Sequence, residues 1–249
     1  MREVLVEVCV DSVESAMAAQ EGGADRIELC DNLVEGGTTP SAGTIAACRN
    51  RLSIPIFVLV RPRGGDFLFS DAEQEVVLKD IAAARQQGAD GVVIGALSAD
   101  GSVDREKVAA MIEAAGKTAV TFHRAFDVSR DAEEALETLV LLGVPRVLTS
   151  GQSPTALEGA AVLKAIVARA AGRVSIMAGG GVNEENVGRI VAATGVREVH
   201  VRGTSTVESR MEFRSPRVTM GKTFLPDDYK RSVTDAARVR RIVDVVANG

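Results

Sequence analysis

The chain has 249 residues, of which 46% are hydrophobic, and its formal net charge at pH 7 is −5. This acidic balance argues against a nucleic-acid partner or an anionic membrane surface, because both recognise clustered positive charge. No apolar run approaches the roughly 18 residues that a membrane span requires, and Glu3 and Glu7 interrupt the apolar N-terminal stretch, which is untypical of a signal peptide. Three cysteines without metal-finger spacing indicate free thiols, so we expect a protein of the reducing cytoplasm.

Short β-rich stretches alternate with helical patterns along the whole chain. The first strand is expected at 4–9, followed by a helix over 13–20 and a second strand at 24–30. Later strands are expected at 54–60, 118–123 and 174–178, and helices near 41–52, 71–87, 104–115, 131–142, 154–170, 183–193 and 232–247. Strands that alternate with helices predict parallel pairing through right-handed crossovers.

One joint between helix and strand recurs four times. A glycine that can end a helix is followed by a small apolar residue and then by a strand, beginning at Gly23, Gly88, Gly143 and Gly195. With the remaining strands, this repeat gives eight strand–helix units, which fit either an open doubly wound sheet or a closed barrel. The length of the chain favours the barrel. We therefore predict an α/β fold, a single TIM-type (β/α)8 barrel domain over 1–249, in which 203–231 is a long loop, an interface or a lid before the last helix.

The polar residues of several strands share one face. Because successive side chains of a strand point to opposite faces, the apolar faces of the first, second and eighth strands suit the helix layer, and the polar faces should point into the barrel. The residues on these inward faces are Glu7, Cys9, Arg26, Glu28, Cys30, Glu198, His200 and Arg202. Arg61 and His123 end the third and fifth strands. We expect these groups at the C-terminal mouth, where barrel enzymes have their active sites.

This cluster predicts an enzyme that acts on a small phosphorylated or carboxylated metabolite by acid–base chemistry. His123 is the proton-transfer candidate, because the ordinary histidine pKa of about 6.5 suits both directions at neutral pH, and Glu28 or Glu7 is its partner. Candidate anion-binding residues are Arg61 and Arg63, the Gly179, Gly180 and Gly181 loop, and Arg202. In the alternative interpretation the buried charges pair with one another and serve only the structure.

Several motifs resemble those of the CutC copper-homeostasis family. They are Val6-Glu7-Val8-Cys9, Ala24-Asp25-Arg26-Ile27-Glu28-Leu29-Cys30, Glu35-Gly36-Gly37-Thr38-Thr39-Pro40-Ser41, 61–67, 121–127, 146–151 and 176–182. The resemblance implies a TIM-like barrel, a cytoplasmic location and a part in copper handling, with no established catalytic activity. The cysteines proposed as copper ligands in the family match Cys9 and Cys30. We also expect a homo-oligomer, most simply a dimer.

The two matching cysteines have the placement that a Cu(I) site requires. Each ends its strand two residues after a glutamate, and neighbouring strands lie about 4.8 Å apart. Paired thiolates favour Cu(I) over harder ions. The competing interpretation is that both are small buried apolar residues. Cys48, expected on the second helix, is interpreted as a core residue.

Overall fold

Eight parallel strands close into a barrel in the computed structural model, which describes residues 3–218 and 227–248. The strands are β1 (Leu5–Val10), β2 (Arg26–Leu29), β3 (Ile56–Leu59), β4 (Gly91–Ile94), β5 (Ala119–Phe122), β6 (Arg146–Thr149), β7 (Ser175–Gly179) and β8 (Glu198–Val201). Each pairs with its neighbour in the chain, and β8 pairs with β1 to close the ring. The predicted TIM-type barrel is confirmed.

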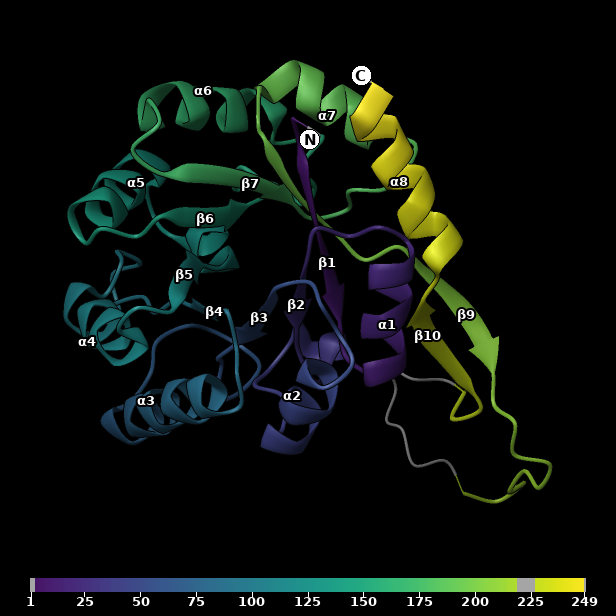
Figure 1. The fold of residues 1–249 in the computed structure, drawn as a ribbon. Coiled ribbons are helices and arrows are strands. Elements are labelled where there is room, and N and C mark those ends of the chain that lie inside the picture. The colour runs from purple at the N-terminus through teal and green to yellow at the C-terminus, as the bar shows by residue number, and fades with distance from the viewer. Residues whose placement is uncertain (1–2, 219–226, 249) are drawn as a thin grey trace.

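Helices cover the outside of the barrel (Figure 1). They are α1 (Val13–Glu21), α2 (Ala42–Arg49), α3 (Asp71–Gln86), α4 (Arg105–Ala115), α5 (Ala132–Leu141), α6 (Ala160–Ala170), α7 (Val187–Thr194) and α8 (Ala236–Asn248), with short 3-10 turns at Leu33–Glu35 and Arg124–Val128. Side chains cap several N-termini, as where Ser12 accepts a hydrogen bond from the Ser15 amide. Among the described residues, none of the helices has the length and apolar character that a membrane crossing needs.

The repeated glycine joint is confirmed in the backbone. Gly23, Gly88, Gly143 and Gly195 have φ of 88°, 85°, 73° and 75°. A residue with a Cβ rarely adopts this left-handed conformation, so glycine allows each helix to end and the chain to turn into the next strand. The joint therefore sets where strands β2, β4, β6 and β8 begin.

Successive side chains of a strand alternate between two environments, the helix layer and the barrel interior. On β1, Val6 and Val8 are fully buried and pack in the main hydrophobic cluster together with residues of the surrounding helices. The alternate residues Glu7 and Cys9 face the barrel interior. Their partners in the register are Arg26 and Glu28 on β2, so one polar layer lies above the other inside the barrel.

The segment predicted as a long loop contains a strand. β9 (Thr204–Glu208) pairs antiparallel with β10 (Lys230–Thr234), and part of the segment, 219–226, lies outside the described residues. These two strands form an arm beside α1 (Figure 1), where Ser15 Oγ accepts a hydrogen bond of 3.2 Å from the Thr234 amide. Because β10 occupies 230–234, the last helix begins at Ala236 rather than near 232.

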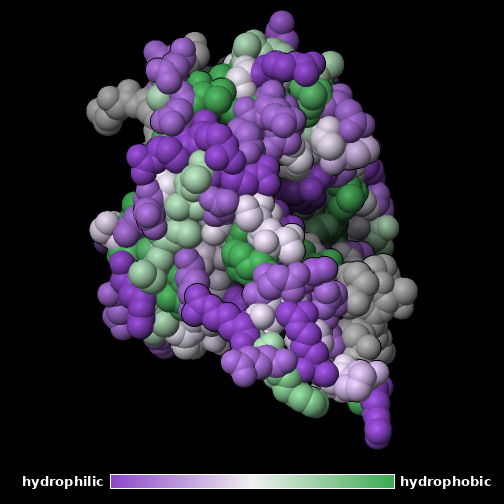
Figure 2. Space-filling model, turned by 90° about the vertical axis from the view of Figure 1, so that its right-hand side faces the viewer, coloured by the Kyte–Doolittle hydropathy of each residue, from purple (hydrophilic) through white to green (hydrophobic). Residues whose placement is uncertain are grey.

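Figure 2 shows the side of the molecule that carries α8 and this arm. Hydrophilic residues cover most of the face, and apolar residues form small separate groups. The described residues of this face therefore show separate apolar groups rather than the contiguous apolar patch that marks many interaction sites.

Candidate metal and anion site at the barrel mouth

The lower layer of the barrel interior is a closed ionic network. Arg26 donates hydrogen bonds from Nε to Glu7 and from Nη2 to Glu198, the latter at 2.9 Å. Glu198 also accepts hydrogen bonds from Arg146 Nε at 2.5 Å and from Ser175 Oγ at 2.6 Å. The expectation that all inward charges gather at the mouth is therefore wrong for Arg26 and Glu198, which begin their strands and lie below it. These two residues show the pairing that the structural interpretation predicts.

Glu7 connects the lower layer to the mouth. Its carboxylate accepts from Arg26 on one side and lies 2.8 Å from His200 Nδ1 on the other. Burial alone would raise the pKa of Glu7, but the hydrogen bonds and positive charges of His200 and Arg26 outweigh burial and lower this pKa to about 2. This lowered pKa favours the ionised form of Glu7, which does not line the cavity at the mouth.

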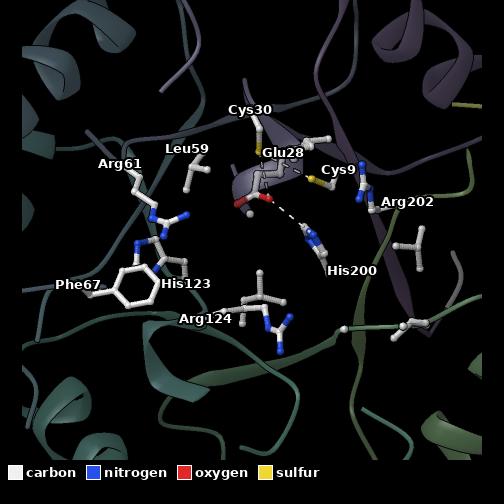
Figure 3. Close-up of a pocket in the computed structure, with 17 residues that line it drawn as sticks. Cys9, Glu28, Cys30, Leu59, Arg61, Phe67, His123, Arg124, His200 and Arg202 are labelled. Carbon is white, nitrogen blue, oxygen red and sulfur yellow. Dashed lines mark hydrogen bonds and ion pairs between the residues drawn. The ribbon is translucent and has the colours of Figure 1, made fainter. Parts of the chain in front are cut away.

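Two thiols and a carboxylate meet above this layer, at the mouth. The Sγ atoms of Cys9 and Cys30 lie 3.7 Å apart, and Cys30 Sγ lies 3.6 Å from Glu28 Oε2. One ligand atom from each of the three residues lies within 4.8 Å of the others, and all three residues are buried. Figure 3 shows this Cys9–Glu28–Cys30 cluster with His200 beside it.

The two thiols differ in their tendency to ionise. A hydrogen bond from Cys30 lowers the pKa of Cys9 to about 5, assisted by nearby His200 and opposed by burial. The same interaction with Cys9, together with burial, raises the pKa of Cys30 well above its ordinary value. Of the two thiols, Cys9 therefore loses its proton more readily than Cys30, as its surroundings favour the thiolate.

Glu28 has the opposite character to Glu7. Burial, together with the negative charges of Cys9 and Glu7, raises the pKa of Glu28 to about 8 despite nearby His200. Its Oε2 lies 3.6 Å from His200 Nε2, and its Oε1 has no hydrogen-bond partner among the described residues. Glu28 thus has an uncommitted oxygen at the mouth.

His200 is a central residue of the site; its place on the inward face of its strand was predicted, but its role was not. Its two ring nitrogens face Glu7 and Glu28, and both glutamates and Cys9 raise its pKa well above the ordinary value even though burial opposes this. The signal was available in the sequence, because His200 alternates with Glu198 on the inward face of β8. Its partners on β1 and β2 could be identified only from the register.

A cavity of about 370 Å³ opens above the cluster. Of the predicted site residues, the lining includes Cys9, Glu28, Cys30, Arg61, His123, Gly180, Gly181 and Arg202. It also includes Arg124, which was not predicted as a site residue. Glu7, Arg63 and Gly179 are not in the lining. A Cβ on Gly179 would lie 2.5 Å from Leu148 Cδ1, so this glycine is required by packing within the barrel.

His123 lies on the other side of the cavity from Cys9 and His200 (Figure 3). Its Nδ1 accepts a hydrogen bond from the Ala125 amide at 3.2 Å, and its buried Nε2 has no hydrogen-bond partner among residues 3–218 and 227–248. Burial and the positive charge of Arg61 lower the pKa of His123 to about 3. The ordinary pKa of about 6.5, on which its predicted proton-transfer role depended, therefore does not apply to this neutral imidazole.

The two arginines of the loop after β3, both predicted to bind an anion, differ in their contacts. Arg61 is buried and donates hydrogen bonds to the carbonyl oxygens of Glu35, Gly37 and Gly65, at 3.1, 3.0 and 2.6 Å. Arg61 thus joins two loops at the rim, and within the described chain no carboxylate forms an ion pair with it. Arg63 instead binds Glu73 and Asp66, outside the cavity.

These features describe a TIM barrel whose mouth combines a pair of thiols, a buried carboxyl group with a raised pKa and a small cavity. The CutC family model matches residues 4–205, so the chain belongs to the CutC family. A human copper homeostasis protein cutC homolog is 48% identical over 98% of this chain and 89% of its own length. A CutC family protein from Bacteroides fragilis is 49% identical over 100% and 99% of the two chains.

Solved structures agree with this assignment. A CutC structure from Streptococcus agalactiae superimposes with a TM-score of 0.77 at 36% identity, covering 80% of this chain and 98% of that one. Phosphoribosyl anthranilate isomerase from Thermococcus kodakaraensis aligns with a TM-score of 0.60 at 18% identity, over 99% and 100% of the two chains. The second likeness concerns the fold alone.

Proposed function

We propose that this protein binds Cu(I) in the cytoplasm through Cys9 and Cys30, as a member of a family whose relatives are named for copper homeostasis. The observation that carries the proposal is the pair of sulfur atoms 3.7 Å apart at the mouth. Both can contact one ion at the distance of about 2.3 Å that is typical of a zinc–thiolate bond. Soft thiolates select Cu(I) over the hard ions of the cell.

The surroundings of the thiol pair favour a soft, singly charged ion. Cys9 and Cys30 are only 5% and 1% exposed, which limits access of water to a bound ion. Cu(I) and its two thiolate ligands would together carry a charge of −1, and the positive charge of the adjacent protonated His200 would offset it. Loading requires that Cys30 lose its proton, so copper binding should release protons and strengthen as the pH rises.

Competitive titration of Cu(I) against a chromophoric chelator tests the proposal. We expect one site per chain in the wild type, weakened at least about 100-fold in Cys9→Ser and in Cys30→Ser, the scale of loss expected when a metal ligand or its support is removed. Cys48→Ser is the matched control, because Cys48 is also a buried cysteine but lies on α2 and is not part of this cluster. Equal copper affinity in all three variants would refute the proposal.

A second candidate function is acid–base catalysis on a small anionic metabolite, and the cavity favours it. A volume of about 370 Å³ lies in the range of small-molecule pockets and far exceeds the space for one ion. The charged residues in the lining include three arginines but only one glutamate, Glu28, whose raised pKa keeps it protonated at neutral pH. Glu28 would donate its proton and His200 would stabilise the carboxylate that results.

Thermal-shift screening with a metabolite library tests this second function. A phosphorylated or carboxylated metabolite should raise the melting temperature of the wild type and of Cys48→Ser. Binding should persist in Glu28→Gln, whereas turnover of the same compound should fall by about 100-fold or more, the scale of general acid–base catalysis. Stabilisation by neutral compounds alone would contradict the proposal.

A further inference from the structure

Arg124 is a fixed cation that the two proposed functions leave unexplained. It lies in the turn after β5, and its Nε donates to Asp127 Oδ2 at 2.6 Å while Nη2 donates to Ser150 Oγ at 3.0 Å. Asp127 is itself held by Thr149 Oγ1 at 2.5 Å and by the Ser150 amide at 2.9 Å. The guanidinium group is therefore oriented from behind. Its Nη1 has no hydrogen-bond partner among the described residues.

The guanidinium group lies next to the glycine loop after β7. A Cβ on Gly180 would lie 3.4 Å from both Cζ and Nη2 of Arg124, and Gly180 and Gly181 have φ of 98° and 69°. Within the described chain, the amides of Gly181 and Val182 donate no hydrogen bond. Arg124, Gly180, Gly181 and Val182 all line the cavity. An oriented cation and two uncommitted amides thus share one part of its wall.

The eighth loop does not supply the helix that many barrels use to bind phosphate at this corner. In such barrels the loops after the seventh and eighth strands and the N-terminus of a short extra helix bind the phosphate group. Here β8 ends at Val201, β9 begins at Thr204, and the next helix after β8 in the described chain is α8. Arg202, exposed and in the cavity lining, is the charged residue of this turn.

We propose that Arg124, with the amides of Gly181 and Val182, forms a subsite for the phosphate group of a phosphorylated metabolite, and that Arg202 adds a second, weaker contact. The uncommitted Nη1 of the oriented guanidinium group can donate a charge-assisted hydrogen bond to a phosphate oxygen, and backbone amides add uncharged donors. This subsite rests on the second candidate function, since it positions an anionic ligand in the cavity. In Figure 3, Arg124 and the Cys9–Glu28–Cys30 cluster lie on different sides of that space, so a ligand bound by its phosphate would extend toward Glu28.

Titration of the full chain with inorganic phosphate, followed by 31P NMR, tests the subsite. Wild type should bind one phosphate, Arg124→Gln should weaken binding by about tenfold or more, and Arg202→Gln should weaken it less, because loss of one charge-assisted hydrogen bond has an effect of this order. Arg130→Gln is the matched control. Arg130 is 47% exposed against 44% for Arg124 and is also paired with acids, but it does not line the cavity.

Each outcome gives a decision. Loss in Arg124→Gln with retention in Arg130→Gln supports the subsite, provided that the unfolding transition of Arg124→Gln matches that of the control. Equal binding by wild type and Arg124→Gln overturns the subsite. If wild type binds no phosphate but metabolite carboxylates still bind in the cavity, the subsite fails and the second function stands. If no anion binds at all, both fail, whereas the copper proposal is untouched.

Discussion

The two polar layers of the barrel interior share strands β1, β2 and β8 and differ in how completely their groups are paired. In the lower layer, Arg26, Glu7 and Glu198 satisfy one another, and Arg146 and Ser175 complete the network. At the mouth, Glu28 Oε1 and Arg124 Nη1 have no partner in the described chain. Fully paired buried charges specify structure, whereas uncommitted groups beside a cavity are available to a ligand.

Glu7 and Glu28 show how this difference in pairing affects the same type of side chain. Both are buried on adjacent strands, yet the pKa of Glu7 is lowered to about 2 and that of Glu28 is raised to about 8. Burial raises both pKa values. Glu7 has Arg26 and His200 to offset burial, whereas Glu28 has the more distant His200 Nε2, at 3.6 Å, and two negative neighbours. Partners, and not depth, decide which carboxyl group ionises.

The largest expected effect comes from breaking the lower layer. Arg26→Met would leave Glu7 and Glu198 buried without their shared cation, so we expect the free energy of unfolding to fall by about 3–5 kcal/mol. Urea denaturation measures this change. Arg130→Gln, on the surface, should change it by less than about 0.5 kcal/mol. A loss below about 1 kcal/mol in Arg26→Met would mean that the lower layer does not stabilise the fold.

A smaller and pH-dependent effect is expected at the mouth. Because the pKa of Glu28 rises from 4.5 to about 8 on folding, the folded state retains a proton that the unfolded state loses between these values. The contribution of Glu28 to stability therefore falls as the pH rises through this window. The unfolding free energy of Glu28→Gln, minus that of wild type, should rise by about 1 kcal/mol per pH unit from pH 5 to 8.

Urea denaturation of both proteins across that pH range checks the slope. Taking the difference between variant and wild type removes the contributions of titrating groups that do not interact with Glu28. A difference that does not depend on pH would show that Glu28 is ionised in the folded protein, like Glu7.

The smallest expected effect is an absence of titration in the two histidines. The pKa of His123 is lowered to about 3, and that of His200 is raised well above its ordinary value. Between pH 5 and 7, His123 should therefore stay neutral with its proton on Nε2, while His200 stays protonated. Long-range 1H–15N NMR of these two rings, the only histidines of the chain, reports both states. A midpoint near 6.5 for His123 would restore it as the proton-transfer residue.

The barrel fold and the proximity of Cys9 and Cys30 could both be predicted from the sequence. Four glycine joints and strand alternation predicted the fold, and the position of Cys9 and Cys30 at the ends of neighbouring strands predicted their proximity. Alternation does not give height in the barrel, which depends on register, so Arg26 was expected at the mouth but lies in the lower layer. The surroundings that lower the pKa of His123 come from the third and fifth loops together, and no local pattern reveals them.

Arg124 is a residue of the cavity that could not be predicted from the sequence. It is two residues from the end of β5, but only the folded chain places it against Gly180, 56 positions away in the sequence. Arg61 and Arg63 were predicted to bind an anion because they lie beside a turn rich in proline and glycine. In the structure Arg61 joins backbone segments and Arg63 pairs with surface acids.

X-ray absorption at the copper edge tests the central claim most directly. The protein would be loaded with one equivalent of Cu(I) under reducing conditions, and Cys48→Ser would be measured alongside it. We predict two sulfur neighbours for the copper ion in both proteins, since Cys9 and Cys30 are the pair whose sulfurs lie 3.7 Å apart. Copper surrounded only by nitrogen and oxygen, or a loss of sulfur neighbours in Cys48→Ser, would contradict the assignment of the mouth as the copper site.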